Sequence, residues 1–260
     1  MKDSKFNIAV LIDGDNAQSK LIKVLIEEVS KYGKATIRRI YGDWTTPQMN
    51  SWKEIINQYS INPIQKFSYT TGKNSTDSSL IIDAMDILHS HSVDGFCIVS
   101  SDSDYTGLAK RIREEGLFVM GIGQKMTPIA FVNSCEVFTF TENLTSELKV
   151  VGEINIEETG TNKGSQPKKV NQKVAKKTKT KSKFPELDIK IIDKAFEIST
   201  NEEDEAFIAK VGSSLRKIDP SFDPRTYGFK TLTQLFKSIK KYTIVKNEVN
   251  GLNHPLVKLK

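Results

Sequence analysis

The sequence has two cysteines and three histidines in 260 residues, and it has no long hydrophobic run. No stretch approaches the roughly 18 apolar residues that cross a bilayer, so we expect no membrane partner. At the start, acidic residues follow the short apolar stretch at once, which is not typical of a signal peptide, and we expect a cytoplasmic protein. Cys97 and Cys135 lie in apolar runs and are expected as buried thiols, a disulfide or metal pair being the alternative.

The sequence also lacks the residues that several kinds of catalytic site require. His89 and His91 are expected at a solvated helix end, so no Ser/His/Asp or Cys/His nucleophile set is supported. No glycine-rich loop precedes a Lys-Ser or Lys-Thr pair, which argues against nucleotide hydrolysis of the P-loop type.

The net charge of +6 is distributed unevenly. Residues 160–183 contain nine lysines and no acidic residue, without hydrophobic periodicity. This composition predicts a flexible linker over 150–183, either a solvated tether or one that binds phosphates, between a domain at 1–149 and a second at 184–260. Basic charge concentrated in such a segment suggests a polyanionic partner.

The first 140 residues alternate apolar, β-rich runs with amphipathic stretches, which predicts an α/β fold with a mostly parallel sheet covered by helices on both faces. Polar chemistry in such folds gathers outside the carboxyl ends of the strands. We expect strands at 6–13, 35–41, 62–67, 95–100, 117–122 and 137–140, and helices at 16–32, 48–59, 76–90 and 105–115.

The last 77 residues predict a smaller unit. Apolar spacing indicates helices near 187–195, 206–215 and 232–239. Strands are expected at 242–249 and 256–259, on either side of the tight-turn pair Asn250 and Gly251. Three helices and a terminal hairpin form a winged helix-turn-helix.

Carboxylates follow the expected strands in a specific pattern. Asp13 and Asp15 end the first strand, Asp102 and Asp104 follow the fourth-strand region, and Asp77 opens a helix. Each of these residues alone could be a helix cap. Together they favour a self-repelling cluster whose oxygen ligands suit Mg²⁺ or Mn²⁺, and two such ions could support phosphodiester cleavage.

Three further polar residues accompany this pattern. Asp83 lies six residues after Asp77 and could support the site as an outer ligand. Asn16 could hold a scissile phosphate, bridge a carboxylate or cap the first helix. Lys73 could contact an RNA phosphate or could be a solvated loop lysine.

Three motifs, LIDGDN, K-x-x-x-D-x-x-L from Lys73 to Leu80, and SSDSDY, resemble in order the NYN domain, a PIN-like ribonuclease group that includes the LabA-like proteins. The resemblance covers residues 6–141. It implies a PIN-like fold and RNA cleavage that depends on Mg²⁺ or Mn²⁺. It also implies that Asn16 is the motif asparagine, that Asp15 stands where the pattern is looser, and that the catalytic and metal-binding residues are Asp13, Asp77, Asp102 and Asp104.

VGSSLRK at 211–217 and FDPRTYGFKTL at 222–232 resemble the OST-HTH domain, also called LOTUS. That resemblance implies a winged-helix RNA-binding module. Arg225 and Tyr227 could stack on unpaired bases, although Tyr227 could instead fill the core. Lys230, Lys237 and Lys241 could face RNA or solvent, with the last two on one helix face at i, i+4.

These observations favour a metal-dependent ribonuclease, expected to be an endonuclease, that recruits single-stranded or structured RNA through its C-terminal module. A non-catalytic RNA-binding or adaptor protein with a degenerate nuclease site is the alternative. A phosphatase of the haloacid-dehalogenase type would also place D-x-D at Asp13 and Asp15, but Ala17 stands where that family expects Thr or Val. A homodimer, and a protein partner for the winged helix, stay open.

Overall fold

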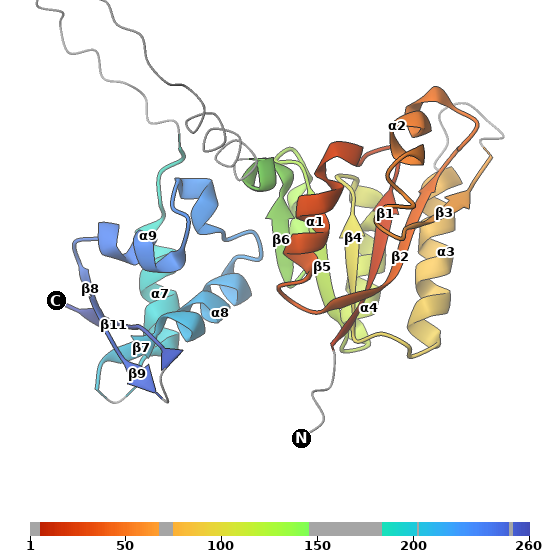
Figure 1. Cartoon of the computed structure of the whole chain (residues 1–260). Helices are drawn as coiled ribbons and strands as arrows, with labels where there is room; N and C mark the ends of the chain where they lie inside the picture. Colours follow the sequence, from red (N-terminus) through yellow and green to blue (C-terminus); the bar gives the residue numbers. More distant parts are fainter. Residues whose placement is uncertain (1–5, 68–74, 146–183, 202, 250–251) are drawn as a thin grey trace, which may run out of the picture.

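The computed structural model describes residues 6–67, 75–145, 184–201, 203–249 and 252–260, which fold into two domains (Figure 1). In the first domain all neighbouring strands are parallel, and their order is β3-β2-β1-β4-β5-β6. The predicted α/β class is therefore confirmed. The strands are β1 (Asn7–Asp13), β2 (Lys34–Gly42), β3 (Asn62–Gln65), β4 (Gly95–Val99), β5 (Phe118–Gly123) and β6 (Val137–Phe140).

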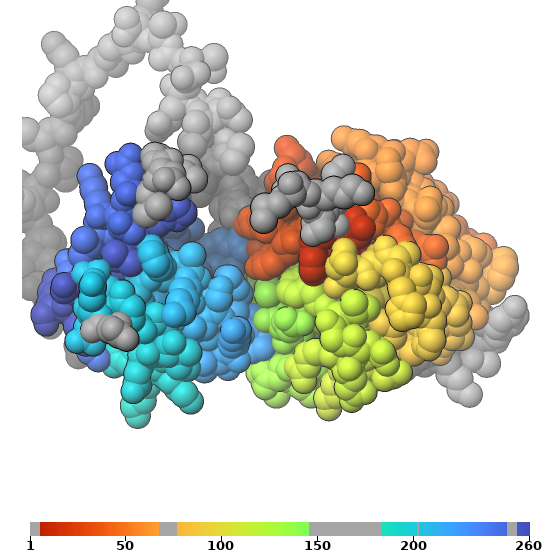
Figure 2. All heavy atoms as spheres, turned by 90° about the horizontal axis from the view of Figure 1, so that it is seen from below, coloured from red at the N-terminus to blue at the C-terminus, as the bar shows by residue number. Residues whose placement is uncertain are grey.

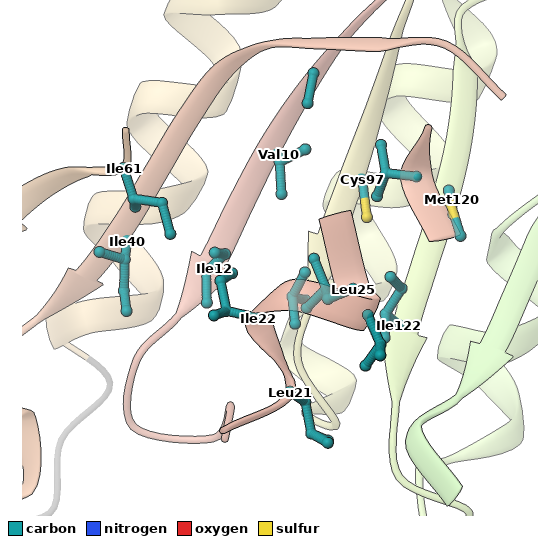
Figure 3. Close-up of a cluster of buried hydrophobic side chains, with 14 of the residues drawn as sticks. Val10, Ile12, Leu21, Ile22, Leu25, Ile40, Ile61, Cys97, Met120 and Ile122 are labelled. Atoms are coloured by element: carbon teal, nitrogen blue, oxygen red, sulfur yellow. The ribbon is translucent and has the colours of Figure 1, made fainter. Parts of the chain in front are cut away.

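Helices cover both faces of this sheet because its central strands are apolar on both sides. One face packs against α1 (Ile22–Val29) and α2 (Asn50–Lys53), which follow the short 3-10 helices η1 (Ser19–Leu21) and η2 (Pro47–Met49). Figure 3 shows this layer, where Leu25 lies over side chains from β1, β4 and β5. The other face packs against α3 (Ser75–His89), α4 (Thr106–Glu114) and α5 (Ile129–Ser134).

The expected helices differ from the observed ones at three places. The helix expected at 16–32 starts only after η1, because residues 14–17 form a turn in which the Asp13 carbonyl accepts the amides of Asn16 and Ala17. The helix expected at 48–59 ends at Lys53 and continues as turns to Ser60, whose φ is +50°. The six-residue α5 has no counterpart in the sequence prediction.

The C-terminal domain has the helices and small sheet of a winged helix-turn-helix, as predicted. Strands β7, β11 and β8 form an antiparallel sheet in that order, and β9 pairs with β10. Its elements are α7 (Ile189–Ser199), β7 (Glu205–Phe207), α8 (Ile208–Ile218), the 3-10 helix η4 (Pro224–Tyr227), α9 (Leu232–Ser238), β8 (Tyr242–Val245), β9 (Glu248–Val249), β10 (Leu252–Asn253) and β11 (Leu256–Leu259).

The two domains meet at the edge strand β6. The Phe138 amide donates to the carbonyl oxygen of Pro220 at 2.8 Å, and Asn143 Nδ2 donates to Thr226 Oγ1 at 2.9 Å. A backbone group of an edge strand thereby gains a partner from the second domain. Within the described ranges, no helix is long and apolar enough to span a bilayer.

Candidate active site at the carboxyl ends of β1 and β4

The acidic residues gather where the strand order of the sheet reverses. Strand β1 lies between β2 and β4, and the chain leaves β1 and β4 toward opposite faces of the sheet. A crevice outside the carboxyl ends of such strands is where open α/β sheets bind ligands. Asp13 is the last residue of β1, and Asp102 and Asp104 follow β4 by a few residues.

Asp13 is fully buried, and its carboxylate is held from three sides. Asn16 Nδ2 donates to Oδ2 at 2.6 Å, Ser100 Oγ donates to the same oxygen at 2.9 Å, and the Asp15 amide donates to Oδ1 at 3.1 Å. Burial raises the pKa of Asp13, the donors Asn16 and Ser100 oppose that rise, and the charge of Asp77 adds to it. Of the roles considered for Asn16, the structure shows the bond to the carboxylate.

A tight turn fixes Asp13 relative to Asp15. The Gly14 amide donates to the carbonyl of Tyr41 at 2.9 Å. A Cβ atom at Gly14 would lie 2.7 Å from that same oxygen and 2.7 Å from Met49 Cε. Only glycine therefore fits between the two carboxylates without displacing β2 or Met49.

Three carboxylates from two segments meet in front of Asp13. Asp77 comes from the first turn of α3, Asp104 lies in the 3-10 helix η3 (Ser103–Tyr105), and Asp102 directly precedes that helix. One oxygen of each lies within 4.8 Å of those of the other two. Asp102 also caps η3, since its Oδ1 accepts the Asp104 amide at 3.0 Å. Capping and clustering, considered as alternatives for Asp102, occur together.

The surroundings of Asp77 raise the pKa of its carboxyl group. Burial raises the pKa of Asp77 above its ordinary value, a hydrogen bond from Tyr105 lowers it, and the negative charges of Asp102, Asp104 and Asp15 raise it further. Asp15 is exposed and thus contributes charge at the rim of the cluster. Like charges at this spacing favour either proton uptake or a bound cation.

The predicted supporting residue Asp83 has its own partners in the sheet. The Asp83 carboxylate accepts hydrogen bonds from Arg39 Nη1 and from the Tyr41 hydroxyl, so both of its oxygens are bound to side chains of β2. It lies six residues beyond Asp77, about 9 Å further along the axis of α3. Lys73 falls outside the described residues.

The sequence prediction missed two residues that hold the cluster. Ser100 donates to Asp13 and accepts the Asp102 amide at 3.1 Å, so it connects the ends of β1 and β4. Tyr105, which is fully buried, donates its hydroxyl to Asp77 Oδ1 at 2.6 Å. Both belong to the SSDSDY motif, and their polar groups in that position were the available signal.

In the C-terminal domain, Arg225 and Tyr227 face inward. The Arg225 guanidinium donates to both oxygens of Asp223 and to both oxygens of Glu28 in α1, and its side chain is 12% exposed. Tyr227 is half-buried, with its ring 5.8 Å from that of Phe222. The structure therefore gives Arg225 an interdomain contact and Tyr227 a place beside the core.

The lysines predicted to bind RNA are exposed but do not share one helix. Lys230 precedes α9, and Lys237 lies in its last turn. The chain leaves the helix at Ile239, whose φ and ψ are −89° and 115°, so the i, i+4 relation expected for Lys237 and Lys241 is wrong. Lys241 instead pairs with Asp193 at 2.7 Å.

A parallel sheet in this order, with a carboxylate cluster at its switch point, defines a PIN-like α/β domain. The family model for the NYN domain matches residues 7–146, and the chain belongs to this family. A second model, for the OST-HTH/LOTUS domain, matches residues 181–254. Both resemblances proposed from the sequence are thus confirmed, and so is their fusion.

Comparisons with individual proteins add no functional assignment. No protein with a curated description matches the chain at a significant level. A crystal structure of a protein of unknown function from Vibrio parahaemolyticus is 20% identical, with 53% of this chain and 94% of the other covered, at a TM-score of 0.44. A solution structure of an uncharacterised protein from Nitrosomonas europaea is 28% identical, with 37% of this chain and 92% of the other covered, at a TM-score of 0.26. The crystal structure of MurG from Acinetobacter baumannii is 11% identical, with 52% of this chain and 41% of the other covered, at a TM-score of 0.35.

Proposed function

We propose that the chain is a metal-dependent ribonuclease, an endonuclease that hydrolyses RNA phosphodiester bonds at the cluster of Asp77, Asp102 and Asp104. The observation that supports this proposal most strongly is the convergence of their oxygens within 4.8 Å at the switch point of an NYN domain. A single acidic residue there could be explained by capping alone, whereas capping does not explain why three from two separate segments converge.

The donor set fits Mg²⁺ or Mn²⁺. It consists of carboxylate oxygens, and these hard cations prefer oxygen ligands. Burial and the negative charges of Asp102, Asp104 and Asp15 raise the pKa of Asp77, and a divalent cation at the cluster would offset both effects. When bound, such an ion would stabilise the charge that develops on the phosphate and on the leaving oxygen.

The residues of the chain divide this task. We assign the ligand role to Asp77, Asp102 and Asp104. We include Asp13 in the proposed catalytic set because its negative charge acts on the neighbouring Asp77. Hydrogen bonds from Asn16 and Ser100 fix the orientation of the Asp13 carboxylate. Tyr105 fixes the direction of the Asp77 carboxylate in the same way.

RNA is the proposed partner because both domains belong to families associated with it. We propose that the OST-HTH domain recruits the substrate, with the exposed Lys230 and Lys237 among its phosphate contacts. Cleavage and recruitment are thereby assigned to different parts of the chain.

The test is incubation of the full-length protein with an end-labelled single-stranded RNA and, separately, with the same RNA closed into a circle. We expect cleavage of both in Mn²⁺ or Mg²⁺ and none in EDTA. Cleavage of the linear RNA alone would contradict endonuclease action. Binding without cleavage under every metal condition would contradict the nuclease proposal and favour the non-catalytic adaptor.

A further inference from the structure

A cleft of about 570 Å³ lies between the two domains, away from the acidic cluster. Its walls come from the end of α4 and the first residues of β5 and β6 on one side, and from the end of α8 on the other. Figure 2, which views the molecule from below, shows the light-blue atoms of the second domain against the green atoms of the first. Since β5 and β6 begin here, the cleft lies at the opposite end of the sheet from Asp102.

The cleft is basic. Arg113, Arg216 and Lys217 line it, against one acidic residue, Glu136. Arg216 is half-buried, yet within the described ranges its guanidinium has no hydrogen bond or ion pair, whereas that of the nearby Arg225 binds two carboxylates. A partly desolvated guanidinium without a carboxylate partner favours an anionic ligand.

Within the described residues, neither of the other two cations forms an ion pair with an acidic side chain. Arg113 Nη1 donates to the carbonyl oxygens of Asn133 and Ser134 at 3.3 and 3.4 Å, which orients the guanidinium without neutralising its charge. Lys217 is exposed and forms no ion pair in the parts of the chain that the structure describes. Two domains therefore contribute positive charge to one cavity.

Aromatic rings stand beside these charges. Tyr32 and Phe118 line the same cleft, and their rings are stacked with centroids 5.6 Å apart and planes 25° from parallel. Both side chains are half-buried, so part of each remains accessible. Cations that follow a phosphate backbone, next to rings that accept stacked bases, are the combination that binds single-stranded nucleic acid.

We propose that this interdomain cleft binds a single-stranded segment of RNA, with its phosphates against Arg113, Arg216 and Lys217 and a base against the Tyr32–Phe118 pair. The proposal rests on RNA being the substrate, as proposed above, and names a surface that holds it. One strand length separates the cleft from the acidic cluster, on the order of 20 Å, so the segment bound here is not the one that is cleaved.

The cleft depends on the docked arrangement of the domains. Arg113 belongs to the NYN domain, and Arg216 and Lys217 belong to α8 of the OST-HTH domain. Removing one cation from each side therefore tests the shared surface, and exposed lysines on the same helices provide controls. Lys110 on α4 and Lys210 on α8 are exposed and do not line the cleft.

The experiment is fluorescence anisotropy of labelled oligouridylate with the full-length protein in EDTA. The double variant Arg113→Ala/Lys217→Ala is compared with Lys110→Ala/Lys210→Ala over a salt series. We expect the first to bind about tenfold more weakly and its salt slope to fall by about 1.4, the value for two lost phosphate contacts on a single strand. We expect the control to match the parent protein.

Equal affinity and equal salt slope in the two double variants would overturn the assignment. An equal loss of affinity for a labelled RNA duplex would overturn the single-strand part, because paired bases cannot stack on the rings. Since binding is measured without metal, the result does not depend on catalysis. If the cleft variant bound RNA normally and the parent protein cleaved RNA with metal, only the cleft proposal would be contradicted. If the cleft variant bound RNA more weakly and the parent protein cleaved no RNA, only the nuclease proposal would be contradicted.

Discussion

The guanidinium of Arg225, in the OST-HTH domain, donates two hydrogen bonds of 3.0 Å to the carboxylate of Glu28, in the NYN domain. Glu28 is 4% exposed and Arg225 is 12% exposed, so the pair is largely desolvated. Asp223 and Lys31 bind the outer sides of the same two groups. The charged network thus connects the first helix of one domain to η4 of the other.

Removal of Arg225 should weaken this connection. We expect Arg225→Ala to lower the free energy of unfolding by about 3–5 kcal/mol, because Glu28 would stay buried without its strongest partner. Thermal unfolding should change from one transition toward two, and the radius of gyration in solution scattering should increase. Lys258→Ala, which removes an exposed pair with Glu205, is the control and should change little. An Arg225→Ala protein with the unfolding curve of the control would show that the pair does not join the domains.

Loss of the Tyr105 hydroxyl should affect the site more than the fold. Tyr105→Phe removes the 2.6 Å bond to Asp77 and creates no cavity. We expect a loss of about 1 kcal/mol in stability from the hydrogen bond. Because Asp77 is then free to rotate, Mn²⁺ affinity measured by calorimetry should fall as well. Tyr242→Phe, which removes a hydroxyl bonded to Asp193 far from the cluster, should cost similar stability and leave Mn²⁺ binding unchanged.

The stability of the metal-free protein should depend on the ionisation of Asp77. Its pKa is raised in the folded state, first by burial and then by neighbouring negative charge, from an ordinary value of 3.8. The folded state thus holds this proton more tightly than the unfolded state does. The resulting stability is present below the ordinary pKa and is lost as the pH rises through the folded pKa.

Asp77→Asn should remove that part of the pH dependence, since the amide still accepts the Tyr105 hydroxyl and carries no charge. Urea unfolding in EDTA over a pH series measures the effect. Asp86→Asn, an exposed residue on the same helix, is the control. The same decline of stability with pH in both variants would contradict the electrostatic account of the cluster.

Gly14→Ala tests the turn that presents Asp13 and Asp15. The added Cβ would lie 2.7 Å from the Tyr41 carbonyl, a backbone atom of β2 that cannot rotate away. We expect a destabilisation of about 1–3 kcal/mol and weaker Mn²⁺ binding. Gly107→Ala, in α4 with no atom near its Cβ position, should be neutral or stabilising. Tight Mn²⁺ binding by Gly14→Ala would show that the geometry of this turn is not required.

The sequence predicted the sheet and the acidic site because both depend on local patterns. Each expected strand of this sheet was found, and the position of Asp13 at the end of one apolar run placed it at the carboxyl edge of the sheet. The strand β7 was missed because a strand of three residues is too short to show a hydrophobic periodicity. Its partner strand β11 lies about 50 residues later in the sequence, so no local pattern indicates the pairing.

The role of Arg225 could not be predicted for a related reason. A loop arginine in an RNA-binding module has the same local sequence whether it faces solvent or a buried carboxylate. Its partner Glu28 is 197 residues earlier in the chain and belongs to the other domain. The interdomain cleft could not be predicted for the same reason, because Arg113 and Arg216 are far apart in the sequence and come together only when the domains dock.

The most direct measurement is the single-turnover rate of RNA cleavage in Mn²⁺ for the wild type, Asp102→Asn and Asp86→Asn, with RNA affinity determined on the same samples. Asparagine can still cap η3, so Asp102→Asn removes charge and a ligand oxygen while the local fold is kept. We expect the rate of Asp102→Asn to fall by at least about a hundredfold, comparable to the loss of one group that stabilises transition-state charge. Its RNA affinity and the rate of Asp86→Asn should stay unchanged. If Asp102→Asn cleaved RNA at the wild-type rate, the assignment of catalysis to this cluster would be contradicted.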